Sequence, residues 1–211
     1  MTETGPTPDT LAQLGRLAEV MHTLRAQCPW DAQQTHESLM TYLIEETAEV
    51  VEAVENGSDE QMVEELGDLL LQIYFHSEIA QESGAFTLAD VAGHVSDKLI
   101  TRHPSIYAGA SRHEDDPDLW EKRKKIEKQR LSAVDGIPEQ LSSLARANKV
   151  VTRIRSHEVE VPLDDTPITA AQAGVAILDV VARAHASGID PDQAVRQAVR
   201  HLEEQARLAE Q

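Results

Sequence analysis

Apolar side chains recur every three or four residues through most of the 211-residue chain, a spacing that predicts α-helices. The first helix is expected over residues 11–26 and should end at Cys28-Pro29, because proline disfavours helical backbone in the residue before it. A second is expected over residues 38–55. One face of this helix is expected to carry Leu43, Ile44, Thr47, Val50, Val51 and Val54.

The next segment predicts a helical hairpin. Asn56-Gly57 supplies a helix stop, and Ser58 followed by Gln61 has the spacing of a capping box. A third helix is therefore expected over residues 59–82, packed antiparallel against the second. This third helix is apolar nearly all round, which predicts burial on most sides, in the core of a bundle or a dimer.

The rest of the chain continues the helical pattern. Aromatic residues make up only 3% of the sequence, and valine and isoleucine fall at helical rather than alternating spacing. We therefore predict an all-α protein, built as an antiparallel helical bundle. The remaining expected parts are a helix over 88–101, a Pro/Gly/Asp-rich loop over 103–119 that is long enough to be a lid, a basic helical segment over 120–130, a linker at 136–138, and helical stretches over about 139–155 and 168–209.

The charge balance excludes some partners. There are 19 Lys plus Arg against 37 Asp plus Glu, and the resulting net charge of −18 would repel a nucleic-acid backbone. The first ten residues have neither a basic nor an apolar targeting pattern, and no apolar stretch approaches a membrane span. Together with the single cysteine, Cys28, this favours a cytoplasmic protein with no membrane partner.

Acidic residues form two motifs in the expected hairpin, Glu-Glu-x-x-Glu in its first helix and Glu-x-x-Asp in its second. Residues three or four apart share one helix face, so each motif should project its carboxylates together. Glutamates usually decorate a solvated surface, and that interpretation is favoured for Glu52, Glu55 and Glu60. An unpaired carboxylate on the apolar third helix would be costly, so a cation is expected to compensate it. The motif acids are Glu45, Glu46, Glu49, Glu65 and Asp68.

Converging carboxylates form a hard, oxygen-only ligand set that suits Mg²⁺, with Mn²⁺ as a substitute. A di-iron site of the ferritin type would require Glu-x-x-His on two helices. The chain offers one such pair, Glu19 and His22, outside the acidic hairpin. The pattern therefore favours magnesium.

The order and flanking residues of these motifs resemble a known family. The segments CPWDAQQTHESLMTYLIEETAEVVEAV, EELGDLLLQIYFHSEIA and SDKLITRHPSIYAG closely resemble the MazG family of all-α nucleoside-triphosphate pyrophosphohydrolases. The resemblance covers residues 11–130 almost without a gap. Tyr42 and Gln61 stand where some members of that family carry lysine.

The resemblance implies a reaction and a set of residues. Metal-activated water would attack the α-phosphorus of a nucleoside triphosphate and release pyrophosphate, with Glu46, Glu49, Glu65 and Asp68 as magnesium ligands. Glu45 would either stand behind these ligands without touching the ion or orient the water. Substrate would contact Lys98, Arg102, Trp120 and Lys124. Trp30 is expected in the nucleoside pocket, with Asp31 and His36 as weaker candidates, whereas His76 is expected to be a satisfied core histidine.

The resemblance also implies a domain organisation. Residues 11–135 are expected to form the catalytic module, and 136–211 to be the remains of a second module without catalytic acids. Residues 1–10 are expected to be disordered because they are rich in Pro and Thr. Gln172 and Val175 then stand where that second module would carry Glu and Asp, and His201 and Gln205 where it would carry Lys and Arg. A homodimer or dimer of dimers is expected.

Two other functions stay open at this point: a nucleotide-binding regulatory protein with little turnover, and a structural bundle stabilised by a metal.

Overall fold

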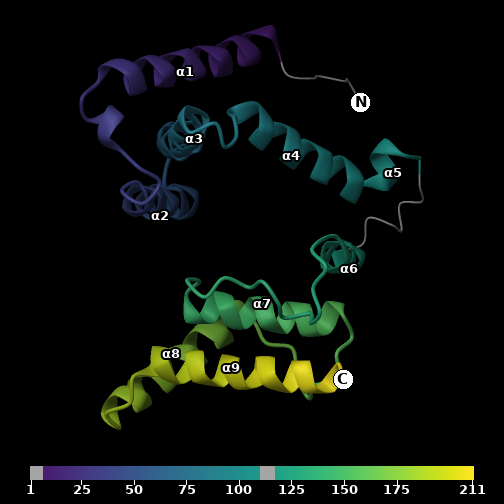
Figure 1. Ribbon diagram of the computed structural model, residues 1–211. Helices are drawn as coiled ribbons and strands as arrows, with labels where there is room; N and C mark the ends of the chain where they lie inside the picture. Colours follow the sequence, from purple (N-terminus) through teal and green to yellow (C-terminus); the bar gives the residue numbers. More distant parts are fainter. Residues whose placement is uncertain (1–6, 110–116) are drawn as a thin grey trace. The chain divides into compact units, whose positions relative to one another are not determined.

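A computed structural model describes residues 7–109 and 117–211, and the side chains of 117–119 lie outside what it describes. All regular elements in these ranges are helices, which confirms the all-α prediction (Figure 1). The chain divides into two compact units, Met1–Lys98 and Leu99–Gln211, and each is described by itself. The predicted division at residues 135/136 rests on likeness between modules and stays a prediction.

From residue 7 onward, the first unit contains four α-helices and one 3₁₀ turn. They are α1 (Pro8–Gln27), η1 (Asp31–Gln33), α2 (Met40–Asn56), α3 (Asp59–Glu82) and most of α4 (Leu88–Arg102). The predicted disorder of residues 1–10 is wrong for its last three residues, because Pro8 starts α1 and the Thr7 side chain caps it. Residues 1–6 lie outside the described part.

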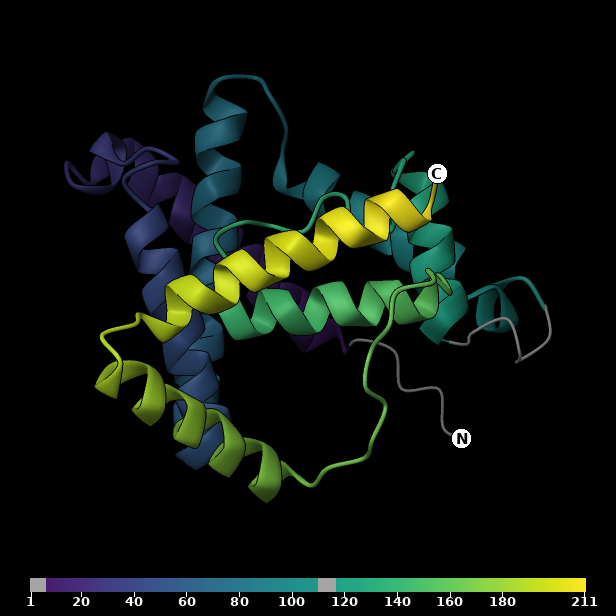
Figure 2. The ribbon, with the colours of Figure 1, turned by 90° about the horizontal axis from the view of Figure 1, so that it is seen from below.

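The hairpin of α2 and α3 has the predicted capping box, with Ser58 and Gln61 bonded to each other's backbone amides. Both helices are seen nearly end-on in Figure 1 and lengthwise in Figure 2, while α1 crosses them steeply. The Tyr74 hydroxyl donates to the Leu14 carbonyl oxygen at 3.2 Å and so ties α3 to α1. The small core of this unit consists of Met21, Leu39, Tyr74 and Phe75.

The expectation that α3 is buried on most sides is wrong within one chain. Its fully buried residues all lie in its second half, where α1 covers it, and Val63 in the first half is 74% exposed. The predicted apolar face of α2 is likewise uncovered, and Ile44 is 72% exposed. Ala53 is the one buried residue of α2.

The second unit is organised around α7 (Ser143–Ser156) and α9 (Pro191–Ala209), which run side by side in both ribbon views (Figures 1 and 2). Its core joins Val134 and Ile137 to Val150 and Ile154 of α7 and to Val199 and Ala206 of α9. The helix α8 has no buried residue. The helices of this unit are α5 (Pro104–Tyr107), α6 (Pro117–Glu127), α7 (Ser143–Ser156), α8 (Ala170–Ala186) and α9 (Pro191–Ala209).

These bounds correct two sequence expectations. The predicted loop 103–119 contains α5 and the start of α6, because Pro104 and Pro117 each begin a helix; residues 110–116 lie outside the described part. The predicted stretch 168–209 is two helices, separated at Gly188, whose φ of +69° ends α8. In the described residues, no helix combines the length and apolarity needed to cross a bilayer.

Candidate metal and nucleotide site

The turn between α2 and α3 is tight enough to require glycine. A Cβ atom on Gly57 would lie 2.7 Å from the Ala53 carbonyl oxygen, closer than a side chain tolerates. Because the two helices leave this turn directly, acidic residues near the end of α2 face acidic residues near the start of α3.

Three carboxylates meet across this hairpin. Glu46 and Glu49 of α2 and Glu65 of α3 each offer one oxygen, and these oxygens all lie within 4.8 Å of one another. Glu46 and Glu65 are half-buried and Glu49 is exposed. This group could hold a divalent cation, since oxygens so spaced can reach one ion. Asp68, the fourth expected ligand, is not part of the three-member group.

Neighbouring negative charges act on the carboxyl group of Glu46. Burial raises the pKa of its carboxyl, and the charges of Asp68, Glu49 and Glu45 raise it further. Asp68 and Glu45 therefore lie near enough to act on the group electrostatically.

Glu65 shows the same effect from the other helix. Its pKa is raised by burial first, then by the charge of Glu49 and by acids that include Asp68 and Glu52. Among the described residues, no lysine, arginine or histidine forms an ion pair with Glu46, Glu49 or Glu65. The compensating cation expected from the sequence is thus not a neighbouring side chain in the described part of the hairpin.

A cavity of about 240 Å³ adjoins the carboxylate group at the turn of the hairpin. Glu49 and Glu65 line it, together with Glu52 and the side chain of Gln61. The sequence interpretation assigned Glu52 to the solvated surface. Its spacing of three from Glu49 was the available signal, because it continues the stripe begun by Glu46 and Glu49.

Trp30 lies after α1 and is 51% exposed. Its indole makes edge contacts with the rings of Tyr42 and Phe75, at centroid distances of 6.0 and 6.3 Å. One side of the indole is thereby fixed by aromatic neighbours while much of it stays accessible.

Asp31 occupies a different environment, since it is buried and its carbonyl oxygen accepts a hydrogen bond from Arg25. The same guanidinium also donates to the Gln34 carbonyl oxygen at 3.1 Å and pairs with Glu82. Arg25 therefore fixes the segment that carries Trp30 and His36.

His36 stacks on His76 with ring centroids 5.0 Å apart, and their Nδ1 atoms lie 2.7 Å apart. Burial lowers the pKa of His76, and the neighbouring His36 lowers it further. The prediction that His76 is fully satisfied is wrong in part, because its buried Nε2 has no hydrogen-bond partner in the described structure.

The remaining expected substrate residues divide between the units. Lys98 is half-buried on α4 at the end of the first unit, whereas Arg102, Trp120 and Lys124 belong to the second. Arg102 is 4% exposed, pairs with Glu127 at 2.6 Å and lies over the Trp120 ring at 4.9 Å. Burial lowers the pKa of Lys124, although Glu121 lies 3.9 Å from its Nζ. Their joint contact with one substrate stays a prediction.

Comparisons with known proteins bear on what this arrangement is for. Residues 34–107 match the MazG nucleotide pyrophosphohydrolase domain, a range that contains all five motif acids. An uncharacterized 26.1 kDa protein in the blaB 3′ region of Streptomyces cacaoi is 37% identical over 204 residues, covering 94% of this chain and 83% of that protein.

Two further relatives have functional names. The nucleoside triphosphate pyrophosphohydrolase/pyrophosphatase MazG of Thermotoga maritima is 33% identical over 220 residues, covering 92% of this chain and 84% of its own length. The nucleoside triphosphate pyrophosphohydrolase of Mycobacterium tuberculosis is 37% identical over 194 residues, but the match covers only 56% of that protein and 90% of this chain. By its matched domain and its long alignments with such relatives, the chain belongs to the MazG nucleotide pyrophosphohydrolase family.

Proposed function

We propose that this protein is a Mg²⁺-dependent nucleoside-triphosphate pyrophosphohydrolase. Water attacks the α-phosphorus, the bond from that phosphorus to the bridging oxygen breaks, and the products are a nucleoside monophosphate and pyrophosphate. Ribo- and deoxyribonucleotides are both included, and the proposed role is removal of unwanted nucleotides from the pool. Mn²⁺ is the proposed substitute metal.

One observation carries this proposal: three carboxylates from two helices lie within 4.8 Å of one another, with no basic side chain paired to them in the described structure. Such a group is electrostatically unfavourable alone and favourable around a divalent ion. The names of the Thermotoga and Mycobacterium relatives support the same reaction.

We assign Glu46, Glu49, Glu65 and Asp68 as the residues that would hold the ion, the first three being those whose oxygens already lie together. When bound, Mg²⁺ would neutralise triphosphate charge and make water a stronger nucleophile at neutral pH. Glu45 is next to Glu46 in sequence and its charge acts on it, so we assign it to orient the attacking water and accept its proton.

For the substrate, we propose that Trp30 stacks on the base, because its indole is held by Tyr42 and Phe75 yet remains half-exposed. His36 is assigned to the same pocket, whereas Asp31 acts through the backbone that Arg25 fixes. Lys98, Arg102, Trp120 and Lys124 remain the proposed contacts to the phosphates and sugar.

Product analysis in ¹⁸O-labelled water tests the reaction. Label in the nucleoside monophosphate, with unlabelled pyrophosphate and a requirement for Mg²⁺, is the expected result. Nucleoside diphosphate and free phosphate as products would contradict attack at the α-phosphorus. A panel of ribo- and deoxyribonucleotides, canonical and damaged, then defines the preferred substrate.

The alternative is a regulatory protein that binds nucleotide without turning it over. It predicts saturable nucleotide binding with no product at any Mg²⁺ concentration. The intact set of motif acids favours the enzyme, because binding alone needs no group to orient water.

We also propose that two copies associate through the uncovered apolar face of α2, formed by Ile44, Val51 and Val54, and through the exposed Val63 of α3. Burial of this face by a second copy fits the dimers implied by the resemblance, with a dimer of dimers as the larger form.

A further inference from the structure

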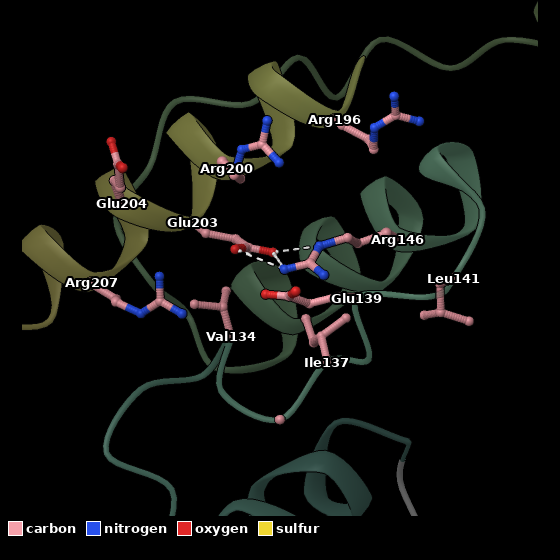
Figure 3. A pocket seen from close by; sticks show the side chains of 11 residues that line it. Val134, Ile137, Glu139, Leu141, Arg146, Arg196, Arg200, Glu203, Glu204 and Arg207 are labelled. Atoms are coloured by element: carbon pink, nitrogen blue, oxygen red, sulfur yellow. Dashed lines mark hydrogen bonds and ion pairs between the residues drawn. The ribbon is translucent and has the colours of Figure 1, made fainter. Parts of the chain in front are cut away.

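The second unit contains a cavity of about 550 Å³, more than twice the volume of the one beside the acidic group. The segment from Val134 to Leu141, α7 and α9 form its walls (Figure 3). All of its lining residues belong to the second unit, in the half of the chain that carries no motif acids.

Four arginines and three glutamates form the charged part of the lining. Arg146 projects from α7, while Arg196, Arg200 and Arg207 project from α9 (Figure 3). The α9 spacing of four and seven residues puts these three arginines on one stripe of the helix. Four arginines therefore surround one cavity in a chain whose net charge is −18.

The acidic neighbours neutralise these arginines unevenly. Glu203 binds Arg146 through both carboxylate oxygens, and both side chains are largely buried. Arg196 pairs with Asp192 one turn before it on α9. Arg207 reaches Asp135 only at 3.5 Å. Arg200 has no hydrogen-bond or ion-pair partner in the described part of the chain.

Two other carboxylates line the cavity, and only Glu139 faces its interior from the wall opposite α9. Glu204 is directed away from the arginines in Figure 3, and its nearest basic group is His201 at 3.8 Å. Glu139 stands on the opposite wall, where its charge opposes any anion that enters.

The wall opposite α9 is held in place by hydrogen bonds from a buried arginine. Arg153 Nη1 donates to the carbonyl oxygens of Ala133 and Asp135, at 2.9 Å each. Gly136 follows with a φ of +70°, a backbone conformation that favours glycine. The cavity is thus bounded on this side by backbone whose position is fixed before any ligand enters.

We propose that this cavity binds a compact phosphate anion carrying several negative charges, such as pyrophosphate or the phosphate chain of a nucleotide. Arg200 and Arg207 are the binding groups, because a guanidinium presents paired N–H donors that match phosphate oxygens. Arg146 adds little net charge, because Glu203 neutralises it, and it forms a fixed part of the wall. This site does not depend on the acidic group, since it needs no metal.

Titration calorimetry with inorganic pyrophosphate in excess EDTA tests the proposal, because without a divalent ion the acidic group repels phosphate. The wild-type protein should bind pyrophosphate saturably. The double variant Arg200→Gln/Arg207→Gln should bind at least about tenfold more weakly, since it removes two groups that make charge-assisted hydrogen bonds to phosphate. Both arginines are exposed, so the fold should persist, as circular dichroism will check.

Two further variants sharpen the result. Arg183→Gln is the matched control, because this exposed arginine of α8 pairs with Asp179 away from the cavity, and its binding should equal that of the wild type. Glu139→Gln should bind pyrophosphate more tightly, since it removes a repelling charge. Glu49→Gln should bind normally in EDTA even if it has lost turnover, which separates this proposal from the proposed reaction.

Parallel titrations with adenosine mono- and triphosphate identify the source of the phosphate. Preference for pyrophosphate would assign the site to that free anion, and preference for the triphosphate to a nucleotide. Absence of saturable binding by all three would overturn the proposal. Equal binding by the wild type and the Arg200/Arg207 double variant would overturn it as well.

Discussion

Glu49 on α2 and Glu65 on α3 offer carboxylate oxygens within 4.8 Å of each other across the tight turn at Gly57. Neither has a basic partner in the described part of the hairpin. If the pair holds a catalytic ion, Glu49→Gln should lower the pyrophosphohydrolase rate by about 100-fold or more. Loss of a residue that only hydrogen-bonds to a metal ligand costs up to about 100-fold, and loss of the ligand itself should cost at least as much. The rate is measured as pyrophosphate release.

Glu55→Gln is the matched control for this substitution, being an equally exposed glutamate of α2 outside the group. Its rate should stay within about twofold of the wild type, as expected for a solvated side chain. Equal rates for the Glu49 and Glu55 variants would refute a catalytic role for Glu49.

The raised pKa of Glu46 predicts a pH-dependent stability difference in metal-free protein. A raised pKa means that the folded state binds this proton more tightly than the unfolded chain does. The resulting stabilisation is complete below the ordinary value of 4.5 and is lost as pH rises through the raised pKa. Glu46→Gln should therefore melt at a higher temperature than the wild type at neutral pH, and the two should converge at about pH 4.

Thermal melting in EDTA across this range measures the effect, with Glu55→Gln run alongside. A Glu46→Gln variant that melts below the wild type at neutral pH would show that Glu46 has a stabilising partner instead of repelling neighbours.

Magnesium should stabilise the folded protein at neutral pH. Binding only to the folded state adds about 2.7 kcal/mol when free metal is about 100 times its Kd. The same addition to Glu49→Gln/Glu65→Gln should give little or no rise in Tm, whereas Glu55→Gln should respond as the wild type does. A rise of equal size in the double variant would place the stabilising ion elsewhere.

Arg25 is 8% exposed and is neutralised by Glu82. Glu82→Gln should cost about 1–3 kcal/mol of stability, because it leaves a buried guanidinium without its anion. The Arg25 bond lowers the pKa of Glu82, so this contribution is present at neutral pH and is lost as pH falls below the ordinary value of 4.5. Urea unfolding with Glu19→Gln, an exposed residue of α1, as control measures it.

The uncovered apolar face of α2 and the exposed Val63 of α3 predict association between copies. Val51→Lys and Val63→Lys should each shift the protein towards monomer in analytical ultracentrifugation, since a buried interface does not tolerate an unpaired lysine. Val91→Lys, on α4 outside this face, is the control. A wild-type protein that is monomeric at every concentration would refute the proposed dimer.

Local chemistry made the hairpin predictable. Ser58, Gln61 and Gly57 act through bonds to nearby backbone, so their spacing alone predicted the turn. The sequence could also predict that Glu46 and Glu49 meet Glu65, because two helices joined by a short turn pack against each other. The sequence could not predict that Asp68 lies outside the three-member group, since that depends on side-chain rotation and not on sequence spacing.

Long-range contacts account for what the sequence did not predict. Arg25 lies in an ordinary helical pattern, and nothing local indicates that Glu82 neutralises it or that it holds the segment of Trp30. The sequence likewise did not predict that Arg102 is buried beside Glu127, so a residue proposed to contact substrate also has a structural partner. The arginine stripe of α9 was visible in the sequence, but the cavity in front of it was not.

The two tryptophans fall one in each compact unit, Trp30 with Tyr42 and Phe75, and Trp120 beneath the guanidinium of Arg102. Each unit therefore carries its own intrinsic fluorophore in a distinct surrounding. Replacing either indole with phenylalanine leaves a single-tryptophan protein, whose indole emission, excited where tyrosine does not absorb, reports during denaturation on one half of the chain alone.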